Sequence, residues 1–103
     1  MAKKDKNTIR YEKGDMHFFT VADAMQYGVE KAVIINHFRF WLRKNLAGNR
    51  NIKDGKVWTY ASVSLLNGLF PYLPEGSISR WIIELEKQNV LCSKNFNRMP
   101  RFL

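Results

Sequence analysis

Apolar residues recur at helical spacing in two neighbouring stretches in the second half of the chain. Ile78, Ile82 and Leu85 stand at i, i+4 and i+7, so residues 78–88 are predicted to form a helix with one apolar stripe facing a core. A shorter helix is predicted over residues 62–70, with these residues turned inward: Val63, Leu66, Leu69 and Phe70. The intervening segment contains two prolines and predicts a turn between the two helices.

Two further helices are predicted upstream. Thr20 is the expected N-cap of a helix over residues 21–27, Asp23 lies in its first turn, and Gly28 is expected to end it in the left-handed conformation. Residues 29–45 predict the central, most buried helix, since apolar residues surround most of it. The residues expected to face the core are Val29, Val33, His37 and Phe40, with Ala32, Ile34, Ile35, Phe38, Trp41 and Leu42 widening that face.

Extended segments are predicted at residues 17–21, at residues 57–60 and after residue 90. In residues 57–60, Trp58 and Tyr60 are expected on one face of a strand, after a loop with a strong Asp54-Gly55 turn signal. The stretch VLCSKNF predicts a strand, NRMP a turn, and RFL a return strand that stops at Leu103. So short a hairpin suggests either a small wing or the N-terminal part of a longer protein.

The order helix, turn, helix, hairpin predicts a mainly α fold with a small β-hairpin, in the arrangement of a winged helix-turn-helix. Residues 1–15 are polar and basic and predict a mobile tail, which is either a solubilising terminus or an arm along phosphates. Residues 16–103 are expected to form one domain.

Composition narrows the function. The 103 residues carry a net charge of +8, which favours an anionic partner, most commonly nucleic acid. The acids are scattered, the phosphate-loop pattern is absent, and His17, His37 and Cys92 lack zinc-site spacing, so we expect no catalytic site, metal or cofactor. A lone cysteine, no signal peptide and no long apolar run indicate a cytoplasmic protein without a membrane span.

In the helix predicted over residues 78–88, the residues outside the apolar stripe suit contact with a DNA major groove. Arg80 can bond guanine bidentately, although an ion pair with Glu84, one turn on, is an equally simple role. The expected DNA-binding residues are Ser77, Ser79, Arg80 and Lys87 on this helix, and Lys94, Arg98 and Arg101 on the hairpin, where they are expected to touch phosphates. Further expected phosphate contacts are Lys53, Lys56 and Tyr72.

Two groups of residues have alternative interpretations. The aromatic residues either stack on unpaired bases or fill the core, and we assign most of them to the core: Trp41, Trp58, Trp81, Phe38, Phe40 and Phe70. Tyr72 and Phe96 are the expected exposed exceptions. A basic cluster near the end of the central helix, opposed only by Asp54, is either a phosphate-binding surface or a solvated face: Arg39, Arg43, Lys44, Arg50, Lys53 and Lys56.

Three motifs together carry a family resemblance: a Trp-Thr-Tyr strand at residues 58–60, a Phe-Pro-Tyr-Leu turn at 70–73 and an Ile-x-Arg-Trp helix at 78–81. Over residues 18–97 the chain resembles winged-helix domains of phage and plasmid replication proteins and related mobile-element proteins. The resemblance implies a module that binds double-stranded DNA, with Arg80 at the basic position of the recognition helix and a homodimer or a replication protein as partner. Pro74 departs from the Ser or Thr N-cap common in such domains.

Two other functions share the predicted fold. One is a transcriptional regulator that binds a palindromic operator as a dimer, although no long dimerisation helix is visible in the sequence. The other is a protein-interaction module whose basic surface meets an acidic protein. Fold alone does not choose between them, because function depends on the surface residues.

Overall fold

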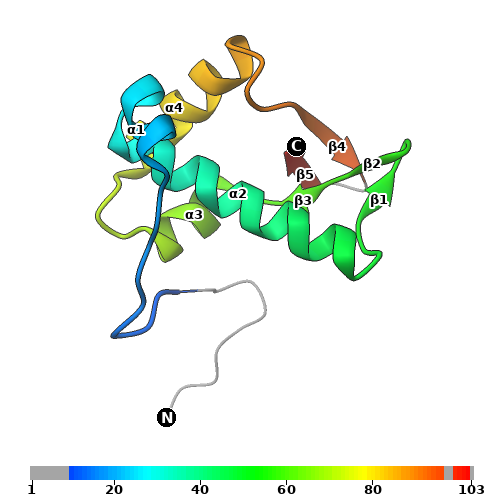
Figure 1. The fold of residues 1–103 in the computed structure, drawn as a ribbon, viewed down its shortest axis with the longest axis horizontal. Helices are drawn as coiled ribbons and strands as arrows, with labels where there is room; N and C mark the ends of the chain where they lie inside the picture. Colours follow the sequence, from blue (N-terminus) through cyan, green and yellow to red (C-terminus); the bar gives the residue numbers. More distant parts are fainter. Residues whose placement is uncertain (1–9, 97–98, 103) are drawn as a thin grey trace.

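A computed structural model describes residues 10–96 and 99–102, which form a mainly α-helical fold with small antiparallel sheets (Figure 1). Four helices span Val21–Tyr27 (α1), Val29–Ala47 (α2), Val63–Leu69 (α3) and Glu75–Lys87 (α4). The strands are Ile52–Lys53 (β1), Lys56–Val57 (β2), Thr59–Tyr60 (β3), Ser93–Phe96 (β4) and Met99–Phe102 (β5). Within these residues, none of the helices combines the length and apolarity needed to cross a bilayer.

The first two helices are held together by a cap and an ion pair. The Thr20 hydroxyl accepts a hydrogen bond from the Asp23 amide at 3.1 Å, which confirms the predicted N-cap of α1. The Asp23 carboxylate is buried and accepts a forked pair of hydrogen bonds from the guanidinium of Arg39 on α2. Gly28 joins the helices at φ 91° and ψ 157°, so its φ is positive but its ψ is not the left-handed helical value we predicted.

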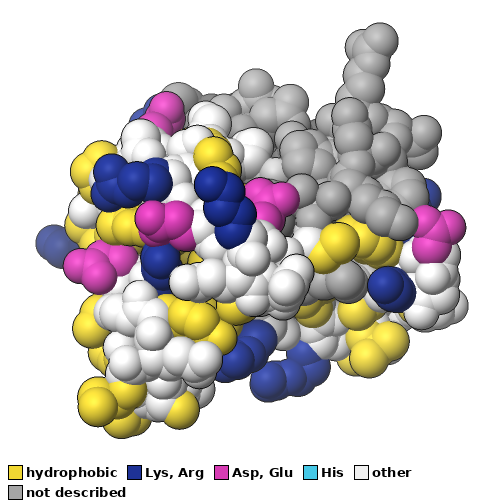
Figure 2. Space-filling model, turned by 90° about the horizontal axis from the view of Figure 1, so that it is seen from above, with side chains coloured by type: hydrophobic (Ala, Val, Ile, Leu, Met, Phe, Trp, Pro, Cys, Tyr) yellow, Lys and Arg dark blue, Asp and Glu magenta, His cyan; other side chains and the backbone are white. Residues whose placement is uncertain are grey.

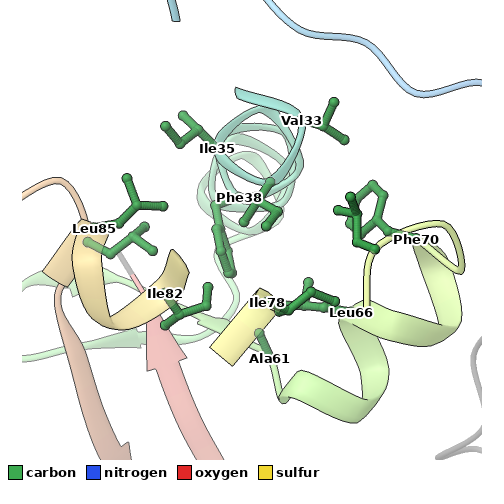
Figure 3. Close-up of a cluster of buried hydrophobic side chains, with 12 residues drawn as sticks. Val33, Ile35, Phe38, Ala61, Leu66, Phe70, Ile78, Ile82 and Leu85 are labelled. Atoms are coloured by element: carbon green, nitrogen blue, oxygen red, sulfur yellow. The ribbon is translucent and has the colours of Figure 1, made fainter. Parts of the chain in front are cut away.

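The core lies between α2, α3 and α4, as Figure 3 shows with α2 seen end-on. Phe38 of α2 points toward Ile78 of α4, and Leu66 of α3 and Phe70, directly after α3, pack in the same cluster. The predicted inward residues of α3 and α4 are confirmed: Leu66, Phe70, Ile78, Ile82 and Leu85 are buried, and Val63 and Leu69 pack against them.

The expected inward face of α2 is only partly right. Val33 is buried and His37 is partly buried, but Val29 and Phe40 are 49% and 52% exposed. The helix is apolar almost all the way round and extends two residues beyond the predicted end, to Ala47. Because α3 and α4 cover only part of its circumference, apolar residues remain at the surface on the rest.

The connection between α3 and α4 is fixed by side-chain hydrogen bonds to the backbone. Ser62 caps α3 by accepting from the Leu65 amide at 3.1 Å, and Asn67 donates to the Leu73 carbonyl at 2.8 Å across the turn. Helix α4 begins at Glu75, three residues earlier than predicted, with Pro74 in the N-cap position and no side-chain cap. These contacts and the buried Leu73 set the position of α4 on the core.

A hairpin of two-residue strands was not predicted from the sequence. Its strands, β1 and β2, pair Ile52 with Val57 and Lys53 with Lys56. Asp54 and Gly55 form the predicted turn and both have positive φ, 55° and 71°, as tight hairpin turns of this kind require.

Trp58 interrupts the strand predicted over residues 57–60. It lies between β2 and β3, and both it and Thr59 are buried, so burial does not alternate along this segment; the predicted shared face of Trp58 and Tyr60 stays a prediction. The Trp58 amide donates to the Asn51 carbonyl, its indole donates to the Lys53 carbonyl, and its own carbonyl accepts from the Asn45 side chain, each at 2.9 Å. These bonds turn the backbone out of a regular strand and anchor the β1–β2 hairpin to the end of α2.

The three remaining strands form one antiparallel sheet in the order β3-β5-β4. Strand β5 pairs Phe102 with Thr59 of β3 and with Ser93 of β4, so the C-terminal hairpin joins the segment that precedes α3. The return strand begins at Met99 rather than after Pro100, so the predicted NRMP turn is too long. Asn97 and Arg98 lie outside the described residues.

Candidate nucleic-acid interface

The outer face of α4 is a continuous row of exposed residues. Gly76, Arg80, Ile83 and Lys87 follow one another at i, i+4, i+7 and i+11 and are all exposed, opposite the buried stripe of the same helix. We call these residues the α4 row. Ser77 and Ser79 lie at the edges of the row and are partly buried. The predicted residues of this helix are therefore brought together on one side of the molecule.

Arg80 is available to an external ligand. Its guanidinium carbon lies 6.0 Å from the centre of the neighbouring Trp81 ring, which keeps the side chain along the helix surface. The alternative ion pair with Glu84 is wrong, because the Glu84 carboxylate is bonded to the ammonium of Lys31 on α2 at 2.9 Å. This bridge links α4 to α2 and neutralises the Glu84 carboxylate.

Acidic residues lie among the basic ones on this part of the surface. Figure 2 shows Lys and Arg side chains interspersed with Asp and Glu on the face that is uppermost in Figure 1, with hydrophobic side chains between them. On α4 the acids are Glu75, Glu84 and Glu86. Binding of a polyanion to this helix would therefore depend on particular side chains rather than on a uniform positive patch.

The hairpin residues are placed by their backbone alone. Lys94 and Arg101 are direct partners in the β4–β5 register, while Arg98 lies outside the described residues. The structure does not describe the side chains of Lys94, Phe96 and Arg101, so the predicted phosphate contacts of the hairpin stay predictions.

The other predicted phosphate contacts lie on two separate elements. Lys53 and Lys56 are partners across the β1–β2 hairpin, where Lys56 is exposed and Lys53 is partly buried. Tyr72 is 58% exposed in the turn before α4, as predicted, and its hydroxyl lies 2.7 Å from Nδ1 of His17. This contact ties the segment before α1 to the turn between α3 and α4.

A groove on another part of the surface was not predicted. It has a volume of about 620 Å³ and is lined by residues of the segment before α1, α2, the loop after α2, β3 and α3, but by none of α4. Phe40 and Trp41 form part of its wall and are absent from the buried core, so assigning them to the core was wrong. Trp58, Phe38 and Phe70 are buried as expected, and Trp81 packs against the core.

His37 lines this groove and is uncharged at neutral pH. Burial, with the nearby His17 adding to the effect, lowers the pKa of His37 from 6.5 to about 4, so its imidazole is neutral. Its ring meets Phe70 edge-on with 5.5 Å between the ring centres. The only sequence signal for the groove was the absence of any acidic residue between Glu30 and Asp54, which pointed to the basic cluster but not to the aromatic wall.

Comparison of the chain with known proteins adds no identification. No protein-family model matches the sequence, and neither the curated proteins nor the solved structures yield a match. Among the described residues, no three His, Cys, Asp or Glu side chains are grouped as a metal site would need.

Proposed function

We propose that this chain is a winged helix-turn-helix module that binds duplex DNA, with α4 in the major groove and the β4–β5 hairpin as the wing. The observation that carries the proposal is the α4 row, an exposed line of residues on a helix whose opposite side is fully packed. A helix held in this way keeps the backbone of its outer residues in a fixed position, from which their side chains can reach base edges.

The connectivity supports the same proposal. Helix α3 leads through a short turn into α4, and the chain then enters a hairpin whose second strand pairs with β3, just before α3. In a winged helix-turn-helix this order places the wing beside the recognition helix, so that helix and wing contact neighbouring parts of one duplex. The Asn67–Leu73 hydrogen bond and the Lys31–Glu84 ion pair both restrain α4.

The chemistry of the α4 row fits base edges. Arg80 supplies a forked donor for guanine, and Ile83, half exposed between Arg80 and Lys87, supplies an apolar surface of the kind that contacts a thymine methyl. Lys87 and the hairpin residues Lys94, Arg98 and Arg101 would contact phosphates, which position the protein without reading sequence. The net charge of +8 favours the same partner.

The biological role we propose is DNA replication in a phage, a plasmid or another mobile element, in the cytoplasm. This part of the proposal rests on the resemblance of residues 58–60, 70–73 and 78–81 to winged-helix domains of such proteins. A homodimer or a replication protein would be the partner.

The test compares base recognition by α4 with phosphate contact by the hairpin. A duplex selected from a random library for wild-type binding is compared with its scrambled sequence by fluorescence anisotropy. Arg80→Ala should lower affinity for the selected duplex by about 1–3 kcal/mol and remove the preference. Lys94→Ala with Arg98→Ala should weaken binding to both duplexes alike.

Lys13→Ala, an exposed cation outside both elements, is the matched control and should change neither affinity; equal weakening of both duplexes would instead favour the phosphate-arm interpretation of residues 1–15. If Arg80→Ala leaves the ratio of the two affinities intact, Arg80 does not read bases. If wild-type protein binds neither duplex, the proposed function is wrong.

A further inference from the structure

The groove described above, which we call the aromatic groove, has exposed aromatic side chains in its wall. Phe40 is 52% exposed and packs edge-on against Trp41, with 5.5 Å between the ring centres. Both residues line the groove together with Phe18, which is also exposed. Aromatic rings left at the surface of a domain that already has a complete core indicate a binding surface rather than unused packing.

Cations lie beside these rings and acids do not. The ammonium of Lys44 is 5.7 Å from the centre of the Phe40 ring and 5.2 Å from that of Trp41, and Arg50 lines the groove directly. No acidic residue lines the groove in the described part of the chain. Arg39, on the same helix, is already paired with Asp23, whereas Lys44 and Arg50 have no acidic partner among the described residues.

Two uncharged polar side chains in the groove can form hydrogen bonds with a ligand. The Asn36 side chain lines the groove and makes no hydrogen bond within the described residues, so its amide can donate and accept. His37 beside it is neutral at physiological pH and offers a further hydrogen-bonding nitrogen.

We propose that this groove binds an unpaired base of single-stranded nucleic acid, stacked on the Phe40 ring with the perpendicular Trp41 ring against its edge, and with the neighbouring phosphates against Lys44 and Arg50. Flat rings beside positive charge are the combination that binds single strands, because every base has a face to stack and every nucleotide has a phosphate. A purely apolar partner would not require the cations, and duplex phosphates would not require the exposed rings. The site shares no residue with the α4 row, so it is independent of the proposed duplex binding.

A single strand and a duplex would then occupy different surfaces of the same domain. That arrangement suits a protein acting where duplex DNA is opened. The duplex function is not needed for the test, since the groove is assayed with a single-stranded probe alone.

The experiment measures binding of fluorescein-labelled oligothymidine by anisotropy at low salt, with an abasic oligonucleotide of equal length as the second probe. Wild-type protein is expected to bind oligothymidine at least about fivefold more tightly than the abasic strand, because only the former can stack. Phe40→Leu removes the aromatic face but keeps apolar bulk, and should weaken oligothymidine binding by about fivefold or more without changing abasic binding. Phe40→Tyr keeps the ring and should retain wild-type affinity.

Two control variants distinguish stacking in the groove from a general effect of altering the protein surface. Phe19→Leu alters an exposed aromatic residue outside the groove and should leave both probes unaffected, and Met25→Ala, at an exposed residue of α1 outside the groove, should leave oligothymidine binding unchanged. Thermal melting of each variant establishes that it is folded, and Phe40→Tyr reports on the site even where Phe40→Leu is destabilised. Equal binding of the two probes, or equal losses in Phe40→Leu and Phe19→Leu, would overturn the proposal, as would tight binding of oligothymidine that survives Phe40→Leu.

Discussion

Replacing Trp58 should test the packing that joins the strands to the helices. The side chain is 1% exposed, and the residue is hydrogen-bonded to Asn51, Lys53 and Asn45. Trp58→Ala removes the largest fully buried side chain among the described residues and should cost about 3–5 kcal/mol. Domains of this size are stable by roughly 5–15 kcal/mol, so the variant should be close to unfolding at moderate temperature.

Trp58→Phe separates the hydrogen bond of the indole from its bulk. The Lys53 carbonyl loses the donor that lies 2.9 Å away, and removing one partner of such a hydrogen bond costs about 1–3 kcal/mol. Urea unfolding followed by far-UV circular dichroism gives both values, with Phe40→Ala as the exposed aromatic control, expected to change stability by about 0.5 kcal/mol or less. A Trp58→Ala protein with the wild-type unfolding midpoint would refute the packing described for this residue.

Two other predictions concern ionisable groups. Because the folded state lowers the pKa of His37 to about 4, the unfolded chain binds the proton more readily between about pH 4 and 6.5, so stability should fall across that range on acidification, by up to roughly 3 kcal/mol. Urea unfolding at both ends of this pH range should show that the free energy of unfolding falls less in His37→Phe than in the wild type. Equal falls in the two proteins would contradict the lowered pKa of His37. Asp23→Ala should destabilise the protein by about 1–3 kcal/mol, because the buried carboxylate is bonded to Arg39. A double-mutant cycle with Arg39→Ala measures their coupling, and a coupling energy near zero would show that the ion pair does not hold α1 on α2.

The helices were predictable where sequence period and cap residues agreed. In α4, Ile78, Ile82 and Leu85 give one clear stripe, and Thr20 and Ser62 are good N-caps at the starts of α1 and α3. The start of α4 was misplaced because Glu75, Gly76 and Ser77 carry no apolar signal before Ile78. In α2 the core-facing side was predicted only in part for the opposite reason, since a helix that is apolar on every side does not indicate which side its neighbours cover.

Only those features of the candidate site that lie within a single helix could be predicted from the sequence. Arg80 and Lys87 follow from their position opposite the apolar stripe, but the partner of Glu84 is Lys31 on another helix, and a pairing across the core cannot be read from helical spacing. The groove likewise forms from segments far apart in the chain, with Phe18 before α1 and Leu69 at the end of α3. The contacts of Trp58 were also not predictable from the sequence, because they depend on the tertiary fold of a hairpin with two-residue strands.

The most direct measurement of the central proposal is the affinity for duplex DNA as a function of salt concentration, determined by anisotropy for the wild type and for Arg80→Ala, Lys87→Ala and the control Lys13→Ala. If cations of α4 and the hairpin neutralise phosphates, the logarithm of the association constant should fall linearly with the logarithm of salt, by about 0.9 for each phosphate contact. Lys87→Ala should make the slope shallower by about one contact, Arg80→Ala should mainly lower affinity for the selected sequence, and Lys13→Ala should match the wild type. Duplex affinity that hardly changes with salt, or that responds equally to all three substitutions, would contradict the assignment of α4 as the DNA-binding helix.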